Sequence, residues 1–224
     1  LTDSIGPRLT GAPGQQAAPD WAVAQYRAWG IDARNEQYGT WRNWRRGIDH
    51  IHLMAPRVRS LEGTLLAWSP GTGGRELEGP AVLLPDVANR AAFEQWLPQV
   101  RGRWVLVSFP EPTCRPNEVW QQFAQPVTFE RMQQARQAAQ QAWTARVGRI
   151  GLQQGDLHRA LENAGALGIV TSSWTGGYGG RRIFNARTER VPTFDLSCED
   201  YGLVARLAER GQGPVLRAFA ALAR

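Results

Sequence analysis

The sequence predicts a mixed α/β (α+β) fold that is rich in strand and has flanking helices. Short apolar runs bounded by glycine or proline recur along the chain, as in "GRWVLVSFP" (102–110) and "VPTFDLS" (191–197), and such runs are typical of buried strands. Segments with helical spacing lie between these runs. The chain has 224 residues, which is room for one large domain or one and a half. Both element types along one chain favour a mixed sheet with flanking helices.

The first part of the chain predicts a helix followed by two strands. Apolar residues between Gln15 and Trp29 share one helical face, and Gly30 is a natural stop. Residues 31–38 alternate weakly and predict a short strand, while "IDHIHLMAP" (48–56) predicts a strand closed by proline. The loop between them carries two tryptophans and three arginines in "TWRNWRRG" (40–47).

From Leu61 onward, strands and helices alternate. A helix is expected after Asn89, a natural N-cap, and others over 157–166 and 199–210. Ser197 and Asp200 have the spacing of a capping box, and Gly211 follows the end of that helix. The expected strands start at "LEGTLLAW" (61–68) and "ELEGPAVLLPD" (76–86), and continue with 102–110, 169–172, 191–197 and the C-terminal "GPVLRAFAALAR" (213–224).

The segment 111–155 interrupts this pattern, because it is rich in glutamine, arginine and alanine. Its expected helix has a thin apolar face, so we interpret the segment as an insertion that packs at the periphery of the domain. The residues of that face are Met132, Ala135, Ala139, Ala142 and Trp143.

Charge and hydropathy argue against two classes of partner, nucleic acids and membranes. The formal net charge is +6, and all 26 basic residues are arginine. These arginines are scattered without a basic stripe, which favours an arginine-rich composition over nucleic-acid binding. Because no apolar run approaches the roughly 18 residues that a bilayer requires, we expect no membrane span.

Few residues suggest chemistry on their own. His50 and His52 share one face of an expected strand, and they either form a metal pair or make local hydrogen bonds; with no third ligand nearby, we predict no metal site. The two cysteines, Cys114 and Cys198, could form one bridge in an exported protein or remain free thiols. The run "TGGYGGRR" (175–182) lacks the helix N-terminus that a phosphate cradle needs.

Four stretches resemble a known family in their order along the chain: "DSIGPRLTG", "AVAQYRAWGI", "LLAWSPGTGG", and "ALENAGALGIVTSS" with "VPTFDLSCEDYGLVARLAERG". Together they resemble the front portion of bacterial zinc-dependent exopeptidases related to aminopeptidase S, glutamate carboxypeptidase and the transferrin receptor. The resemblance implies that residues 1–56 are the N-terminal segment of an incomplete catalytic α/β domain. Residues 57–220 would be a β-rich protease-associated (PA) domain, with the helical insertion at about 111–155.

The resemblance also implies what this chain lacks. The family's two zinc ions are held by a His-x-Asp, a bridging Asp, a Glu-Glu pair, a further acidic residue and a late His, none of which can be placed here. We therefore expect no catalytic residue and no cofactor in this chain, which would be inactive alone, and two zinc ions in the full-length parent. The implied location is secreted or periplasmic, and the implied partners are a peptide substrate and the missing catalytic domain. The alternative is a stand-alone PA-type protein-interaction module without peptidase activity.

Within such a PA domain, the loop 174–187 is the best candidate for substrate contact. Trp174 and Tyr178 offer aromatic surface, as does Phe184, while Arg181 and Arg182 could bind a carboxylate. The alternative interpretation is an exposed connection with no role. A second candidate, for which an interface with the missing catalytic domain is the other interpretation, comprises Trp41, Trp44, Arg45 and Arg46.

Overall fold

The computed structural model describes residues 3–6, 8–179, 182–184 and 186–222. The chain divides into two compact units, one of Leu1–Arg46 with Leu222–Arg224 and one of Gly47–Ala221.

The first unit contains one helix, α1 (Pro13–Ala28), which has Pro13 in its first turn and buries no residue. Gly30, with φ of +78°, follows its end, as the sequence predicts. The strand expected over 31–38 is wrong: residues 31–45 form neither helix nor strand. A weakly alternating segment becomes a strand only when another strand pairs with it, and none does so here.

The remaining elements alternate as the fold class requires. The strands are β1 (Arg46–Ala55), β2 (Arg59–Leu61), β3 (Gly63–Leu65), β4 (Leu77–Leu83), β5 (Trp104–Leu106), β6 (Gly168–Thr171), β7 (Thr193–Leu196) and β8 (Val215–Leu222). The helices are α2 (Arg90–Trp96), a 3₁₀ turn η1 (Leu97–Val100), α3 (Asn117–Phe123), α4 (Pro126–Ile150), α5 (Gln154–Asn163) and α6 (Cys198–Glu209).

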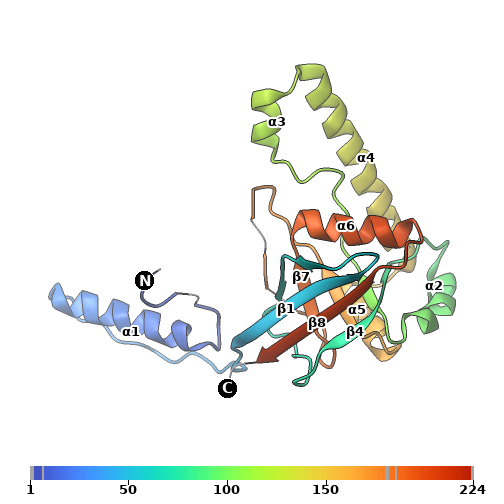
Figure 1. Cartoon of the computed structure of the whole chain (residues 1–224). Coiled ribbons are helices and arrows are strands. Elements are labelled where there is room, and N and C mark those ends of the chain that lie inside the picture. Colours follow the sequence, from blue (N-terminus) through green and yellow to red (C-terminus); the bar gives the residue numbers. More distant parts are fainter. Residues whose placement is uncertain (1–2, 7, 180–181, 185, 223–224) are drawn as a thin grey trace. The chain divides into compact units, whose positions relative to one another are not determined.

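The eight strands form one sheet in the order β2-β1-β8-β4-β5-β6-β7-β3. Strands β4 to β7 run parallel, whereas β2 pairs with β1, β8 with β4, and β3 with β7 in antiparallel fashion. Strands β1 and β8 are neighbours, and Figure 1 shows their arrows pointing in opposite directions. The mixed sheet with flanking helices confirms the predicted fold class.

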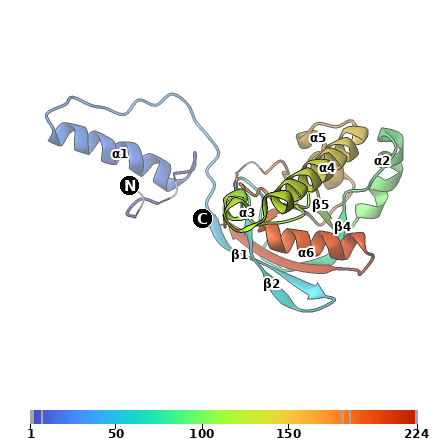
Figure 2. The same cartoon turned by 90° about the horizontal axis from the view of Figure 1, so that it is seen from above.

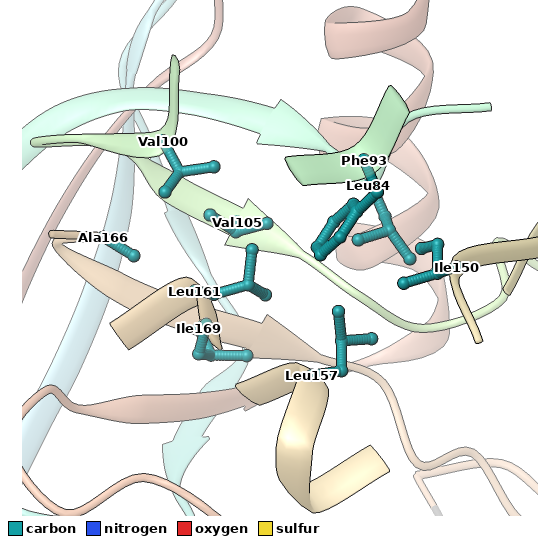
Figure 3. Close-up of a cluster of buried hydrophobic side chains, with 9 residues drawn as sticks. All are labelled: Leu84, Phe93, Val100, Val105, Ile150, Leu157, Leu161, Ala166 and Ile169. Atoms are coloured by element: carbon teal, nitrogen blue, oxygen red, sulfur yellow. The ribbon is translucent and has the colours of Figure 1, made fainter. Parts of the chain in front are cut away.

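Both faces of the parallel strands are covered. Val105 of β5 and Ile169 of β6 pair in register and pack on one face against Phe93 of α2 and against Leu157 and Leu161 of α5 (Figure 3). Helix α6 lies on the opposite side of β4 and β5 from α2 and α5 (Figure 2). Because successive side chains alternate across a strand, short and fully apolar strands such as β5 are what a sheet covered on both faces requires.

Gly168 shows how tightly the second face is packed. A Cβ atom at this position would lie 2.2 Å from the indole of Trp104. That indole crosses the backbone of the neighbouring strand and meets the ring of Phe194 edge-on, with ring centroids 6.0 Å apart. Glycine is therefore required at position 168 because an aromatic side chain occupies the space above it.

The predicted helix caps are largely confirmed. The side chain of Asn89 accepts a hydrogen bond from the amide of Ala92 at 3.0 Å, and Ser197 caps α6 by accepting from the amide of Asp200 at 3.3 Å. The carboxylate of Asp200 does not complete the capping box. It accepts from the amide of Glu62 at 2.6 Å and pairs with Arg59 at 2.8 Å, so the start of α6 is joined to the segment between β2 and β3.

Helices α3 and α4 project away from the sheet (Figure 1). Of its 25 residues, α4 buries only Ile150, the last one, before ending at Gly151 in the left-handed conformation. Three of the five residues expected on its inward face, Met132, Ala139 and Trp143, are half-buried, whereas Ala135 and Ala142 are exposed. The half-buried stripe also includes Arg136 and Arg146. A disulfide between Cys114 and Cys198 connects the segment before α3 to the first residue of α6.

Candidate functional site

The loop predicted to contact substrate leaves the sheet at the carboxyl ends of parallel strands β5 and β6. The amide of Ser172 donates to the hydroxyl of Ser108 at 3.0 Å, which ties the two strand ends together. The hydroxyl of Tyr201, on α6, donates to the carbonyl of Ser108 at 2.7 Å and accepts from its amide at 2.8 Å. Burial raises the pKa of Tyr201 far above its ordinary value, so this phenol stays a neutral hydrogen-bonding group. Carboxyl ends of parallel strands are common ligand sites in α/β proteins.

The loop presents one fixed aromatic side chain and several exposed ones. Trp174 is half-buried, and its indole nitrogen donates to the carbonyl of Gly177 at 2.7 Å. Tyr178 and Phe184 are 69% and 55% exposed. Arg182 is exposed, and its amide donates to the carbonyl of Ser173 at 3.0 Å. Arg181 lies outside the described residues. The structure thus brings the backbone of Arg182 next to the base of the loop beside Trp174.

A turn after β3 supports the far side of the loop. The amide of Ala67 donates to the carbonyl of Ile183 at 3.0 Å, and its carbonyl accepts from the amide of Ala186 at 3.2 Å. The next residue, Trp68, has φ of +61°. This backbone conformation costs a bulky residue on the order of 1–3 kcal/mol, and it tends to occur where function constrains the chain.

Glu162 holds the end of the loop, a role that the sequence did not indicate. This carboxylate on α5 is buried, and its Oε1 accepts hydrogen bonds from three successive amides, those of Glu189, Arg190 and Val191. Three converging N–H groups form a binding site for negative charge made by the backbone itself. A glutamate on an amphipathic helix normally faces water, so only the packed structure shows this contact.

His158 lies one helical turn before Glu162 and is also buried. In the part of the chain that the structure describes, neither of its ring nitrogens has a hydrogen-bond partner. Burial, followed by the charge of Arg187, lowers the pKa of His158 to about 4. The imidazole is therefore neutral at physiological pH and serves as a packing group beneath the loop.

Arg136 of α4 reaches the loop from the projecting arm. Its guanidinium carbon lies 5.5 Å from the centroid of the Trp174 ring. The same side chain lies 3.2 Å from Glu111 Oε2, in an ion-pair contact whose angle does not make it a hydrogen bond. Burial raises the pKa of Glu111, while the charge of Arg136 opposes that rise. The insertion therefore supplies a partly buried charge pair at the base of the candidate loop.

The second predicted region belongs to the first unit. Trp44 is only 8% exposed, and the guanidinium of Arg46 lies 5.2 Å from its ring centroid. Trp41 is 60% exposed, and Arg45 is exposed as well.

The histidine pair makes local contacts. His52 Nδ1 lies 3.2 Å from the hydroxyl of Ser60, and the ring of His50 stacks on Phe219 with centroids 5.4 Å apart. His50 Nε2 is 3.6 Å from a carboxylate oxygen of Glu76. These contacts favour the interpretation of local hydrogen bonding and packing.

The described residues contain neither a group of metal ligands nor a membrane-spanning helix. Across residues 3–222, apart from the few positions not described, no three histidine, cysteine or acidic side chains are grouped so that they could hold a metal ion. The described residues therefore do not fit the two-zinc site of the exopeptidase family that the sequence resembles. Within the same described portion, every helix is too short or too polar to cross a bilayer.

Comparison with known proteins shows the fold alone. No protein-family model and no curated protein matches the chain. A Peptidase M28 precursor from Shewanella amazonensis is similar in structure, with a TM-score of 0.62 and 20% identity over 100% of this chain and 45% of its own. An aminopeptidase from Aneurinibacillus sp. strain AM-1 aligns with 96% of this chain and 40% of its own, at 12% identity and a TM-score of 0.49. BSAP, a zinc aminopeptidase from Bacillus subtilis, aligns with 99% of this chain and 41% of its own, at 14% identity and a TM-score of 0.46. The chain thus spans less than half the length of these proteins and shares the fold of that part of an M28 peptidase precursor.

Proposed function

We propose that this chain is the non-catalytic, PA-domain portion of a secreted or periplasmic zinc exopeptidase, and that it covers the active-site cleft and helps to select substrates. The four resembling stretches and the fold shared with an M28 peptidase precursor support this proposal. In it, the two zinc ions belong to the rest of the parent protein. Residues 1–56 belong to its catalytic domain and 57–220 form the PA domain.

The observation that carries the proposal is the construction of the loop at the ends of β5 and β6. Glu162 fixes its far end, Trp174 is held at its base, and Tyr178 and Arg182 remain exposed. A loop with a rigid base and exposed aromatic and guanidinium groups suits the recognition of a peptide that carries a carboxylate.

The disulfide between Cys114 and Cys198 supports export of the protein, since such bonds persist mainly in oxidising compartments.

The alternative, a stand-alone PA-type interaction module, is favoured by a different observation. Helix α1 buries no residue and leaves Trp29 67% exposed, with Trp21 and Tyr26 close to half exposed. Such a helix suits contact with another protein surface, which is the catalytic domain in the main proposal and a separate partner in the alternative.

The test uses the full-length peptidase with Arg181 and Arg182 changed singly to alanine. A guanidinium that binds a carboxylate in a closed cleft should contribute roughly 10- to 150-fold to kcat/KM for acidic peptides. Neighbouring residues of an extended segment point to opposite sides, so we expect the loss in one variant only. Neutral peptides and Arg210→Ala, an exposed arginine at the end of α6, are the controls. Wild-type values for both variants on every peptide would reject substrate contact by this loop.

A further inference from the structure

Arg136 is the point at which the projecting arm meets the candidate loop. It belongs to α4, yet its side chain is only 17% exposed. Long charged side chains on a peripheral helix normally extend into water, so burial of this one requires partners for its donors. The structure supplies those partners within one short segment that precedes α3.

The two terminal nitrogens of the guanidinium donate to acceptors around Cys114. One terminal nitrogen donates to the carbonyl of Thr113 at 3.0 Å and, more weakly, to that of Arg115 at 3.5 Å. The other donates to the side chain of Asn117 at 2.7 Å. The two carbonyls flank Cys114, which the disulfide joins to Cys198 at the start of α6. The acceptors of Arg136 are therefore held to the body of the unit by a covalent bond.

The same guanidinium lies over the ring of Trp174, at 5.5 Å from the ring centroid. The edge of the indole is fixed by its hydrogen bond to Gly177, and one face is fixed by Arg136. A cation over an indole face is attractive, and more so where water is excluded. Arginine suits this place because its planar group can stack and donate in its own plane at the same time, which lysine cannot do.

We infer that Arg136 is a positioning residue that fixes Trp174 and thereby orders the loop 174–187 for its ligand. The part of this inference that concerns a ligand rests on the proposed function. The part that concerns the order of the loop does not. The insertion then has a role, because its helix α4 places the Arg136 guanidinium against Trp174, and Thr113 and Asn117 hold the guanidinium there.

The experiment uses the whole chain labelled with 5-fluorotryptophan, with the ¹⁹F resonance of Trp174 assigned by Trp174→Phe. Arg136→Gln should shift or broaden that resonance and speed trypsin cleavage after Arg182 by about tenfold, since cleavage follows the population of the opened loop. Arg136→Lys keeps the charge but loses the fork and the stack, so it should shift the resonance in the same direction. It also serves as the test variant if Arg136→Gln fails to fold.

The matched control is Arg149→Gln on the same helix. Arg149 binds Asp86 and the carbonyl of Val87, away from Trp174, so its loss should leave the Trp174 resonance and the cleavage rate unchanged. An unshifted Trp174 resonance in folded Arg136 variants would overturn the inference, as would an equal shift in Arg149→Gln. If the Arg136 variants move Trp174 while the peptide kinetics show no role for the loop, the positioning role stands and the proposed function fails.

Discussion

At the scale of single residues, the buried polar groups beneath the loop are the most informative. Glu162 and His158 both lie on α5, one turn apart, and both are turned toward the core. The Glu162 carboxylate accepts hydrogen bonds from backbone amides, whereas the His158 imidazole is neutral. The two side chains should therefore respond to substitution and to pH in different ways.

Replacing Glu162 by glutamine should destabilise the protein by roughly 1.5–3 kcal/mol. The amide oxygen keeps the position but loses the charge that three amide donors share, and hydrogen bonds to charged groups contribute about that much. Urea unfolding of the two proteins measures the difference. Glu94→Gln, which removes one exposed ion pair with Arg90, should change stability by no more than about 0.5 kcal/mol. Equal losses in both variants would show that the amide donors do not need a charged acceptor.

His158 predicts a pH dependence between about 4 and 6.5. Its pKa is near 4 in the folded state, below the ordinary value of 6.5, so the unfolded chain binds the extra proton in this range. Stability should therefore fall as the pH drops through this window, by up to about 3 kcal/mol.

The measurement compares the pH profile of unfolding for the parent and for His158→Leu, which has no titrating group at this position. The difference between the two curves isolates the histidine, because carboxylates titrate in both proteins. His52→Gln, at a half-exposed position, should keep the slope of the parent. A parent and a His158→Leu variant with parallel profiles would contradict the prediction.

Residue patterns predicted some of the candidate site and could not predict the rest. The aromatic and arginine residues of the loop stand out because they sit among glycines, and the structure leaves Tyr178 and Arg182 exposed as that pattern suggests. Arg136 and Glu162 give no such signal. Each is a charged residue on a helix, and whether it faces water depends on partners 19 or more residues away along the chain, as with Asn117 and Val191.

At the scale of elements, the helix and strand pattern was largely predictable because local chemistry determines it. The caps at Asn89 and Ser197 and the apolar run of β5 each have a physical cause within a few residues. Residues 31–38 show the limit, because a strand exists only where a neighbour pairs with it. The inward face of α4 was predicted only in part: Met132, Ala139 and Trp143 are half-buried, but Ala135 and Ala142 are exposed. Arg136 and Arg146 share the half-buried stripe, because long arginine stems can also cover apolar surface.

The disulfide gives a prediction at this scale, because it fastens the arm to α6. Cys114 and Cys198 are 84 residues apart, and closing a loop of that length restricts the unfolded chain by about 4–5 kcal/mol in the chain-entropy description. The double variant Cys114→Ala/Cys198→Ala should lose about 3–5 kcal/mol of stability in denaturant unfolding. The parent unfolded in the presence of a reductant should show a similar loss. An unchanged midpoint in both experiments would mean that the bridge does not restrict the unfolded chain.

At the scale of the whole molecule, the order of the strands was beyond sequence analysis. Strand β1 hydrogen-bonds to β8, although some 160 residues separate them, and β3 pairs with β7 across a gap of almost 130 residues. Periodicity identifies a strand but not its neighbour, since many pairings satisfy the same apolar pattern. The class of fold could therefore be predicted, whereas the order of the strands in the sheet had to come from the structure.

The pairing of β1 with β8 has a consequence for how the second unit connects to the rest of any polypeptide. The strand by which the chain enters and the strand by which it leaves lie side by side with opposite directions, so entry and exit fall at the same end of one strand pair (Figure 1). Neighbouring strands are about 4.8 Å apart. This unit could therefore be inserted into a surface turn of another domain with almost no separation of the two cut ends of that turn. The entropy of closing the turn would then hardly change. In mechanical terms, tension applied through both connections would pull β1 and β8 apart one hydrogen bond at a time, beginning at that shared end.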